Sequence, residues 1–302
     1  MRYGMNLLLW TDELTEAALP TLERLKTIGY DNVEIPIMKG DPDDFYRWSK
    51  KLDELGLERS VVTVRTADDN PISRDRNTRE LGVARTKQAL DCCEAIGAKL
   101  LAGPFHSALG VFSGRGPTAE EWSYGVESMQ RVAEYAERRG ITLGLEYLNR
   151  FECYFLNSAE DTARFVEVVD NPRCQMIYDT FHAHIEEKSV EDSLLRSQKH
   201  LVHVHVSEND RGTPGEGQVR WEETFRSLIE MQYEGVLMVE AFGLALPSLA
   251  AATKIWRRMY RDEFQLAKDA LAFMRYQWED NLAHGRRSRF SKLSANYSGL
   301  GT

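Results

Sequence analysis

The chain has 302 residues, of which 42% are hydrophobic and 28% charged, and its formal net charge is −9 at pH 7. This composition is typical of a soluble globular protein with a large core, and no apolar run approaches the roughly 18 residues that span a bilayer. The acidic balance argues against nucleic acid as a partner, because its phosphates require clustered Lys and Arg. The one basic cluster starts at His284, in the C-terminal tail, and is expected to be solvated or to reach a neighbouring subunit.

The first residues do not resemble a targeting segment. Acidic residues begin at Asp12, too early for a secretion signal, so we expect a cytoplasmic protein. The four cysteines show neither a CxxC spacing nor the framework of a secreted protein, and they are Cys92, Cys93, Cys153 and Cys174. We expect all four to be reduced and structural.

Eight short runs of aliphatic and β-branched residues are predicted to be strands. In chain order they lie at residues 3–9, 32–37, 59–64, 99–104, 141–147, 174–179, 201–207 and 235–242. Helical segments separate them, with apolar residues at i, i+3 and i+4 and a closing glycine. Alternating strands and helices indicate parallel pairing through right-handed crossovers, and eight repeats are the number that closes a barrel. The sequence therefore predicts an α/β fold, a (β/α)8 TIM barrel.

An open, doubly wound sheet is the alternative fold. That fold usually carries a glycine-rich phosphate turn after its first strand, where this chain reads LLLWTDEL instead. A long helical stretch from Ser248 is expected to supply the eighth helix and to continue beyond it. We assign residues 1–275 to a single catalytic barrel domain. Residues 276–302 form a C-terminal helical extension that either packs on a neighbouring subunit or frays.

Polar side chains close four consecutive strands of the predicted barrel. Glu146, Asp179 and Glu240 end strands five, six and eight, and strand seven carries His203 and His205 on one face. The active site of such a barrel lies at the C-terminal mouth, so these groups should converge. Converging carboxylates resist ionisation, and a divalent cation removes that penalty. The mixed oxygen and nitrogen set suits Mn²⁺, Mg²⁺ or Co²⁺ better than zinc, which takes more His or Cys.

Each of these residues also has a purely structural interpretation. A carboxylate at a strand end often caps a helix or joins an ion pair, and Asp179 is well placed to cap the next helix. His203 lies deeper in its strand and is expected to be a hydrogen-bonded core histidine rather than a ligand. Capping alone rarely places metal-competent groups at the ends of four consecutive strands, so the set favours a site.

With these residues in view, the chain resembles the ketose 3-epimerases, the D-tagatose and D-psicose 3-epimerase group of the xylose-isomerase-like TIM barrels. The resemblance runs from residue 3 to about residue 275. It is sharpest in EYLNRFE (146–152), YDTFHAHIEE (178–187), HVHVSENDRGTPGEG (203–217) and VEAF (239–242). Any one of these motifs would be a weak signal, but four in the order and spacing of the family are a strong one.

This resemblance implies a reaction and a set of residues. The implied metal ligands, with Mn²⁺ as the expected ion, are Glu146, Asp179, His205 and Glu240. Glu146 and Glu240 are also the implied catalytic acid–base pair. The expected reaction is metal-dependent epimerisation of a free ketose at C3. A base removes the C3 proton, the metal stabilises the resulting enediolate, and an acid on the other face returns a proton.

The resemblance also implies substrate contacts. Glu152, His182 and Arg211 would hold the C1 to C3 oxygens, and Trp10 resembles the family's aromatic wall against the sugar. The chain departs from the family at Asn6, where an aromatic residue is common, and in the loop at residues 104–121, which lacks a tryptophan-containing stretch. Both departures concern the far end of the substrate, so the preferred sugar stays open.

Three other functions remain as alternatives. An isomerase, dehydratase or deglycosidase acting on an inosose or 3-oxo-sugar would use the same metal and acid–base pair. A nuclease of the endonuclease-IV type would share the barrel but need more histidine ligands and a positive surface. A non-catalytic sugar-binding barrel would not need two opposed carboxylates. The expected partners are a small-molecule sugar and further copies of the chain in a dimer or tetramer, with no nucleic acid and no membrane.

Overall fold

The computed structural model describes the backbone of residues 1–297 and the side chains of residues 1–283. Within these residues, eight parallel strands pair in chain order and close into a barrel, because β1 also pairs with β8. The strands are β1 (Arg2–Asn6), β2 (Asn32–Pro36), β3 (Glu58–Val62), β4 (Leu100–Gly103), β5 (Thr142–Glu146), β6 (Cys174–Asp179), β7 (Leu201–Val206) and β8 (Val236–Val239). Each overlaps a predicted run, so the TIM barrel is confirmed and the open sheet is excluded.

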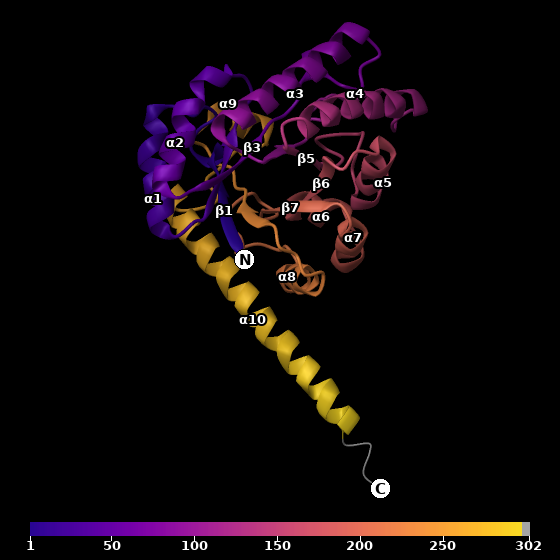
Figure 1. Ribbon diagram of the computed structural model, residues 1–302. Coiled ribbons are helices and arrows are strands. Elements are labelled where there is room, and N and C mark those ends of the chain that lie inside the picture. Colours follow the sequence, from indigo (N-terminus) through magenta and orange to yellow (C-terminus); the bar gives the residue numbers. More distant parts are fainter. Residues whose placement is uncertain (298–302) are drawn as a thin grey trace.

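The helices surround this barrel (Figure 1). Over the described backbone, the short 3-10 helices are η1 (Leu7–Leu9), η2 (Glu16–Ala18), η3 (Pro42–Asp44) and η4 (Ala67–Asp69). The α-helices are α1 (Leu19–Ile28), α2 (Tyr46–Leu55), α3 (Arg76–Ile96), α4 (Ala119–Glu137), α5 (Ala159–Val169), α6 (Thr180–Glu186), α7 (Val190–Ser197), α8 (Trp221–Glu230), α9 (Pro247–Ala252) and α10 (Glu263–Tyr297).

Local sequence explains how the helices end and return the chain to the barrel. Gly29, Gly56 and Gly97 follow α1, α2 and α3 with φ of 113°, 63° and 80°, a left-handed conformation that glycine adopts without steric cost. At the N-terminal end of α4, Thr118 and Glu121 form a capping box. Short, well-capped connections keep consecutive strands adjacent, and this adjacency closes the barrel in chain order.

The strands are almost wholly buried, as expected for a parallel sheet covered on both faces. All five residues of β2 are buried, and so are the last four of β5. The four cysteines are buried and unpaired, in agreement with the sequence prediction. The polar groups at the C-terminal ends of the strands are therefore held by a rigid apolar frame.

The predicted long helix from Ser248 is interrupted, which corrects the sequence prediction. Helix α9 ends at Ala252, and α10 begins only at Glu263, where Asp262 accepts hydrogen bonds from the next turn. Tertiary packing explains the break. Ala250 and Ile255 bury their side chains in a small apolar cluster that also contains Leu8, Val62 and Phe242. One straight helix would not deliver both residues to this cluster.

Helix α10 crosses residue 275 as one continuous helix, and its C-terminal half projects from the barrel (Figure 1). The division at residues 275 and 276 therefore coincides with no break in secondary structure and stays a prediction, as does the role of the extension. The basic cluster from His284 lies outside the residues whose side chains are described. Among the described residues, no helix is both long and apolar enough to cross a membrane.

Candidate active site

Four polar side chains converge at the C-terminal end of the barrel. Glu146 and Asp179 are the last residues of β5 and β6, His205 is next to last in β7, and Glu240 directly follows β8. Each is buried, and each offers one ligand atom within 4.8 Å of the others. Strand register produces this meeting, because His205 pairs with Asp179 on one side and with Met238 on the other. The structure thus brings together all four residues predicted as metal ligands.

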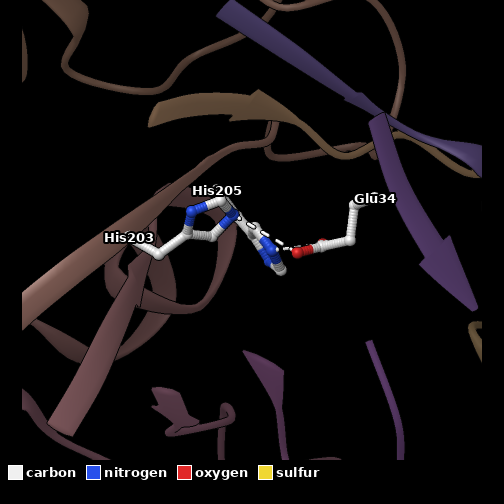
Figure 2. A group of neighbouring side chains, drawn as sticks. All are labelled: Glu34, His203 and His205. Atoms are coloured by element: carbon white, nitrogen blue, oxygen red, sulfur yellow. Dashed lines mark hydrogen bonds and ion pairs between the residues drawn. The ribbon is translucent and has the colours of Figure 1, made fainter. Parts of the chain in front are cut away.

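The two nitrogens of His205 have different environments. Its Nδ1 is buried without a hydrogen-bond partner, 3.5 Å from Glu146 Oε1, 3.5 Å from Glu240 Oε1 and 3.8 Å from Asp179 Oδ2. Its Nε2 lies 2.8 Å from Oε1 of Glu34, across the barrel (Figure 2). A neutral ring that donates its proton to Glu34 presents a lone pair to three carboxylates. A cation between them would satisfy all four groups, so these residues fit a divalent metal.

The pKa shifts of the four side chains also fit a metal site. Burial raises the pKa of Glu146 and of Glu240, although the charge of His205 partly offsets it. Burial likewise raises the pKa of Asp179 to about 6, against the opposing charge of Arg211. Burial alone would lower the pKa of His205, but carboxylates around it raise this pKa well above its ordinary value. The cluster therefore retains protons that a divalent cation would displace.

Arg211 reaches into the same cluster. Its Nη1 donates to Asp179 Oδ2 at 3.1 Å and to Glu240 Oε2 at 2.8 Å, and the guanidinium carbon lies 3.7 Å from the ring centroid of Phe181. Its backbone has a φ of 63°, an uncommon conformation for a residue other than glycine and one that is concentrated at functional sites. The guanidinium neutralises part of the carboxylate charge and leaves further donors at the mouth.

His182 lies beside Arg211 and is neutral at pH 7. Burial and the charge of Arg211 lower its pKa well below the ordinary value. Its Nδ1 accepts the backbone N–H of Asn149 at 3.0 Å, so the proton of the neutral ring is on Nε2. This Nε2 lies 3.7 Å from Glu146 Oε1 and 3.1 Å from Arg211 Nη2. The N–H of His182 Nε2 and the guanidinium of Arg211 are therefore two neighbouring donors beside the carboxylates of the cluster.

Glu152 lies in the loop after β5, outside the cluster of four residues. Its Oε1 accepts from Asn149 Nδ2 at 2.8 Å, and its backbone carbonyl accepts from Gly110 N–H at 2.8 Å. Glu152 is thus linked to His182 through Asn149, and it joins the loops that follow β4 and β5. Asn149 is buried and was not singled out from the sequence.

Asn6 and Trp10 flank the 3-10 helix η1, which follows β1. The Trp10 ring lies against Phe264 of α10 at 5.3 Å between centroids, and its indole Nε1 is buried without a partner. Asn6 donates through Nδ2 to Glu34 Oε1 at 3.0 Å and to Glu240 Oε1 at 3.2 Å. The structure therefore brings Asn6 to the cluster, whereas the Trp10 ring packs on α10.

Comparison with known proteins agrees with this geometry. Residues 22–276 match the family described as the xylose isomerase-like TIM barrel. The chain belongs to this family. A protein of Synechocystis sp. named "Probable ketose 3-epimerase" is 28% identical over 93% of this chain and 98% of its own length. The L-ribulose 3-epimerase of Methylomonas sp. is 29% identical over 92% of this chain and 98% of its own.

A solved structure of an L-ribulose 3-epimerase superposes on this xylose isomerase-like barrel with a TM-score of 0.90. Its sequence is 28% identical, and the match covers 95% of this chain and 97% of that one. These relatives are named 3-epimerases, and epimerases are a class of isomerase. They confirm the resemblance to ketose 3-epimerases that the four motifs indicated, and with it the expectation of an isomerase.

Glu34 is a second residue near the site of this xylose isomerase-like barrel, besides Asn149, that the sequence did not reveal. It lies on β2, fully buried, and accepts from Ser60 Oγ at 2.9 Å as well as from Asn6 and His205. His203 is also buried, and its Nε2 lies 3.3 Å from Oε2 of Glu34; its role as a core histidine rather than a ligand stays a prediction. The charges of these histidines hold the pKa of Glu34 well below its usual range, although burial alone would raise it. A carboxylate inside the apolar run NVEIPI was the available signal, because it needs a buried partner.

Proposed function

We propose that this protein epimerises a free ketose at C3, using a divalent cation held by Glu146, Asp179, His205 and Glu240. One observation is the main support for a metal at this site: the buried Nδ1 of His205 has no hydrogen-bond partner and faces three carboxylates at 3.5 to 3.8 Å. The reaction is supported by relatives that are named ketose or ribulose 3-epimerases and that match nearly the whole chain.

The acid and the base of this reaction are Glu146 and Glu240. They come from β5 and from the residue after β8, and each places Oε1 3.5 Å from His205 Nδ1. One carboxylate removes the C3 proton on one face of the sugar, and the other, as a carboxylic acid, returns a proton on the opposite face. Burial raises the pKa of both, so that either can hold the proton. A cation held by the four ligands would supply positive charge that stabilises the negative charge developing on the sugar oxygens.

The remaining predicted contacts hold the substrate. We assign the donors of His182 and Arg211 to the sugar oxygens near C1 to C3, and Glu152 to a hydroxyl in the same region, oriented by Asn149. Trp10 is assigned to the wall of the site. Asn6 remains a predicted contact, although its amide nitrogen already donates to Glu34 and Glu240.

The proposed ion is Mn²⁺, with Mg²⁺ and Co²⁺ as alternatives, because three carboxylate oxygens and one imidazole nitrogen suit these hard or borderline ions. A homo-oligomer, either a dimer or a tetramer, and a cytoplasmic location also stay predictions.

The experiment is a substrate panel in deuterated water. Protein stripped with a chelator and reloaded with Mn²⁺ is incubated with D-fructose, D-tagatose and L-ribulose, and the products are followed by chromatography and NMR. We expect a C3 epimer carrying deuterium at C3, with no elimination, and loss of turnover in the stripped protein. Turnover that survives chelation, or exchange only with a 3-oxo-glycoside, would contradict the proposal and favour the dehydratase or deglycosidase alternatives.

A further inference from the structure

A connected set of hydrogen bonds lies beneath the proposed metal site and spans the barrel interior. Glu34 extends from β2 toward His203 and His205 on β7 (Figure 2). Its Oε1 lies 2.8 Å from His205 Nε2 and 3.0 Å from Asn6 Nδ2. The same nitrogen of Asn6 lies 3.2 Å from Glu240 Oε1. Glu34 and Asn6 therefore connect two of the proposed metal ligands from outside the metal cluster.

When His205 is neutral, one arrangement of the protons satisfies the donors of this set. Ser60 Oγ and Asn6 Nδ2 are donors to Glu34, and His205 Nε2 lies at hydrogen-bond distance from it. An ionised carboxylate only accepts hydrogen bonds, so it satisfies all three donors when His205 carries its proton on Nε2. The Nδ1 of His205 is then the atom that is free to bind a cation.

The orientation of Asn6 is fixed from the other side. Its Oδ1 accepts the backbone N–H of Leu8 at 2.9 Å, where the amide caps the turn η1. A flipped amide would place its oxygen against two carboxylates and lose this cap. The Nδ2 group is therefore directed at Glu34 and Glu240, and a displacement of Glu34 is transmitted to Glu240.

We propose that Glu34 is a positioning residue of the metal site. It holds His205 in the tautomer whose Nδ1 faces Glu146, Asp179 and Glu240, and through Asn6 it fixes Oε1 of Glu240. This inference rests on the proposed function for the presence of the metal. Carboxylates that hold the second nitrogen of a metal-ligating histidine orient the ring, and their loss typically lowers metal affinity by roughly 10–100-fold.

The test is Glu34→Gln in the full-length protein. The glutamine fits the same space, but its amide nitrogen can donate to His205 Nε2 and so permits the tautomer with the proton on Nδ1. We expect the Mn²⁺ Kd of the chelator-stripped protein, measured by calorimetry, to rise by roughly 10–100-fold. In Mg²⁺-loaded protein with ¹⁵N-labelled histidine, the wild type should show His205 protonated on Nε2, and the variant should show a mixture. A structural role of Glu34 alone would not move this signal.

Asp69→Asn is the matched control. Asp69 is also buried and has charged partners, Arg65 at 3.0 Å and Arg85 at 3.1 Å, but it lies outside the proposed metal site. We expect this control to lower Tm and to leave the Mn²⁺ Kd unchanged. If Glu34→Gln does not fold, Glu34→Asp keeps the charge but withdraws it from His205, and the Kd should rise here too.

The outcomes separate this inference from the proposed function. A wild type that binds Mn²⁺ and epimerises, with a Glu34 variant that binds equally tightly and keeps the tautomer, overturns the positioning role alone. A wild type that binds no Mn²⁺ overturns both. A weakened site in the Glu34 variant and an unchanged site in the Asp69 control support the positioning role.

Discussion

The Nε2 of His182 lies 3.1 Å from Nη2 of Arg211, although both nitrogens are donors while the imidazole is neutral. The neutral ring must carry its proton on Nε2, because its Nδ1 already accepts the N–H of Asn149. Buried donors are costly unless an acceptor satisfies them. A sugar or enediolate oxygen that accepts from both would relieve the contact, so this pair favours an oxygen-rich ligand at the mouth of the barrel.

Glu240→Gln is predicted to abolish turnover while changing the affinity for the sugar by less than about an order of magnitude, because proton transfer at C3 contributes about 10²–10⁴-fold. The variant retains the shape of Glu240 and an oxygen ligand but cannot take up the proton. Turnover is measured at saturating Mn²⁺, and sugar binding by calorimetry. Glu121→Gln, in the capping box of α4, is the control and should retain activity. Full turnover in the Glu240 variant would show that the acid–base assignment is wrong.

Arg211→Lys is predicted to lower kcat/KM by roughly 10–1,000-fold, through both binding and orientation. A lysine retains the charge, but one ammonium group cannot reach Asp179, Glu240 and a substrate oxygen while stacking on Phe181. The Mn²⁺ Kd should change far less than kcat/KM. Arg85→Lys, on α3, is the control. An equal loss of metal affinity would place Arg211 in the support of the metal rather than of the sugar.

The affinity for Mn²⁺ is predicted to rise with pH up to at least about pH 6. The pKa of Asp179 is raised by burial to about 6 from an ordinary 3.8, so the folded, metal-free protein binds a proton there that the unfolded chain releases. The contribution of this group to stability therefore falls as pH rises from about 4 to 6. Metal must displace that proton, so the Kd should fall about tenfold per pH unit below pH 6 for each proton released. Calorimetry in buffers of different ionisation enthalpy counts the protons, and a pH-independent Kd would contradict this account.

Removal of the metal is predicted to lower thermal stability. At a free Mn²⁺ concentration one hundred times its Kd, binding stabilises the native state by about 2.7 kcal/mol. For a chain of this size that corresponds to a rise in Tm of roughly 4 °C. Scanning calorimetry with and without a chelator measures the difference. Asp179→Asn should reduce the rise, since it removes one of the proposed ligands. A Tm that Mn²⁺ does not change would argue against a cation bound at the mouth of the barrel.

The sequence by itself determined the barrel and the residues at its mouth. The alternation of apolar runs with amphipathic segments is a local property, and it located all eight strands within a few residues. Because parallel strands end at one rim, the polar groups Glu146, Asp179 and Glu240 could be assembled without coordinates. The same reasoning pointed to β7, where His203 and His205 share one face and His205 lies nearer the C-terminal end of the strand.

Only the tertiary structure decided how these groups are held. Glu34 is 171 residues from His205 in the chain and meets it only because the closed barrel places β2 across from β7. No local pattern reports which imidazole nitrogen faces the carboxylates, since that depends on a partner from the opposite wall. The break before Glu263 has the same kind of cause, since the helical pattern continues there while packing against Leu8 and Val62 stops the helix. Periodicity records which side of an element is buried, whereas barrel closure decides what each buried group meets.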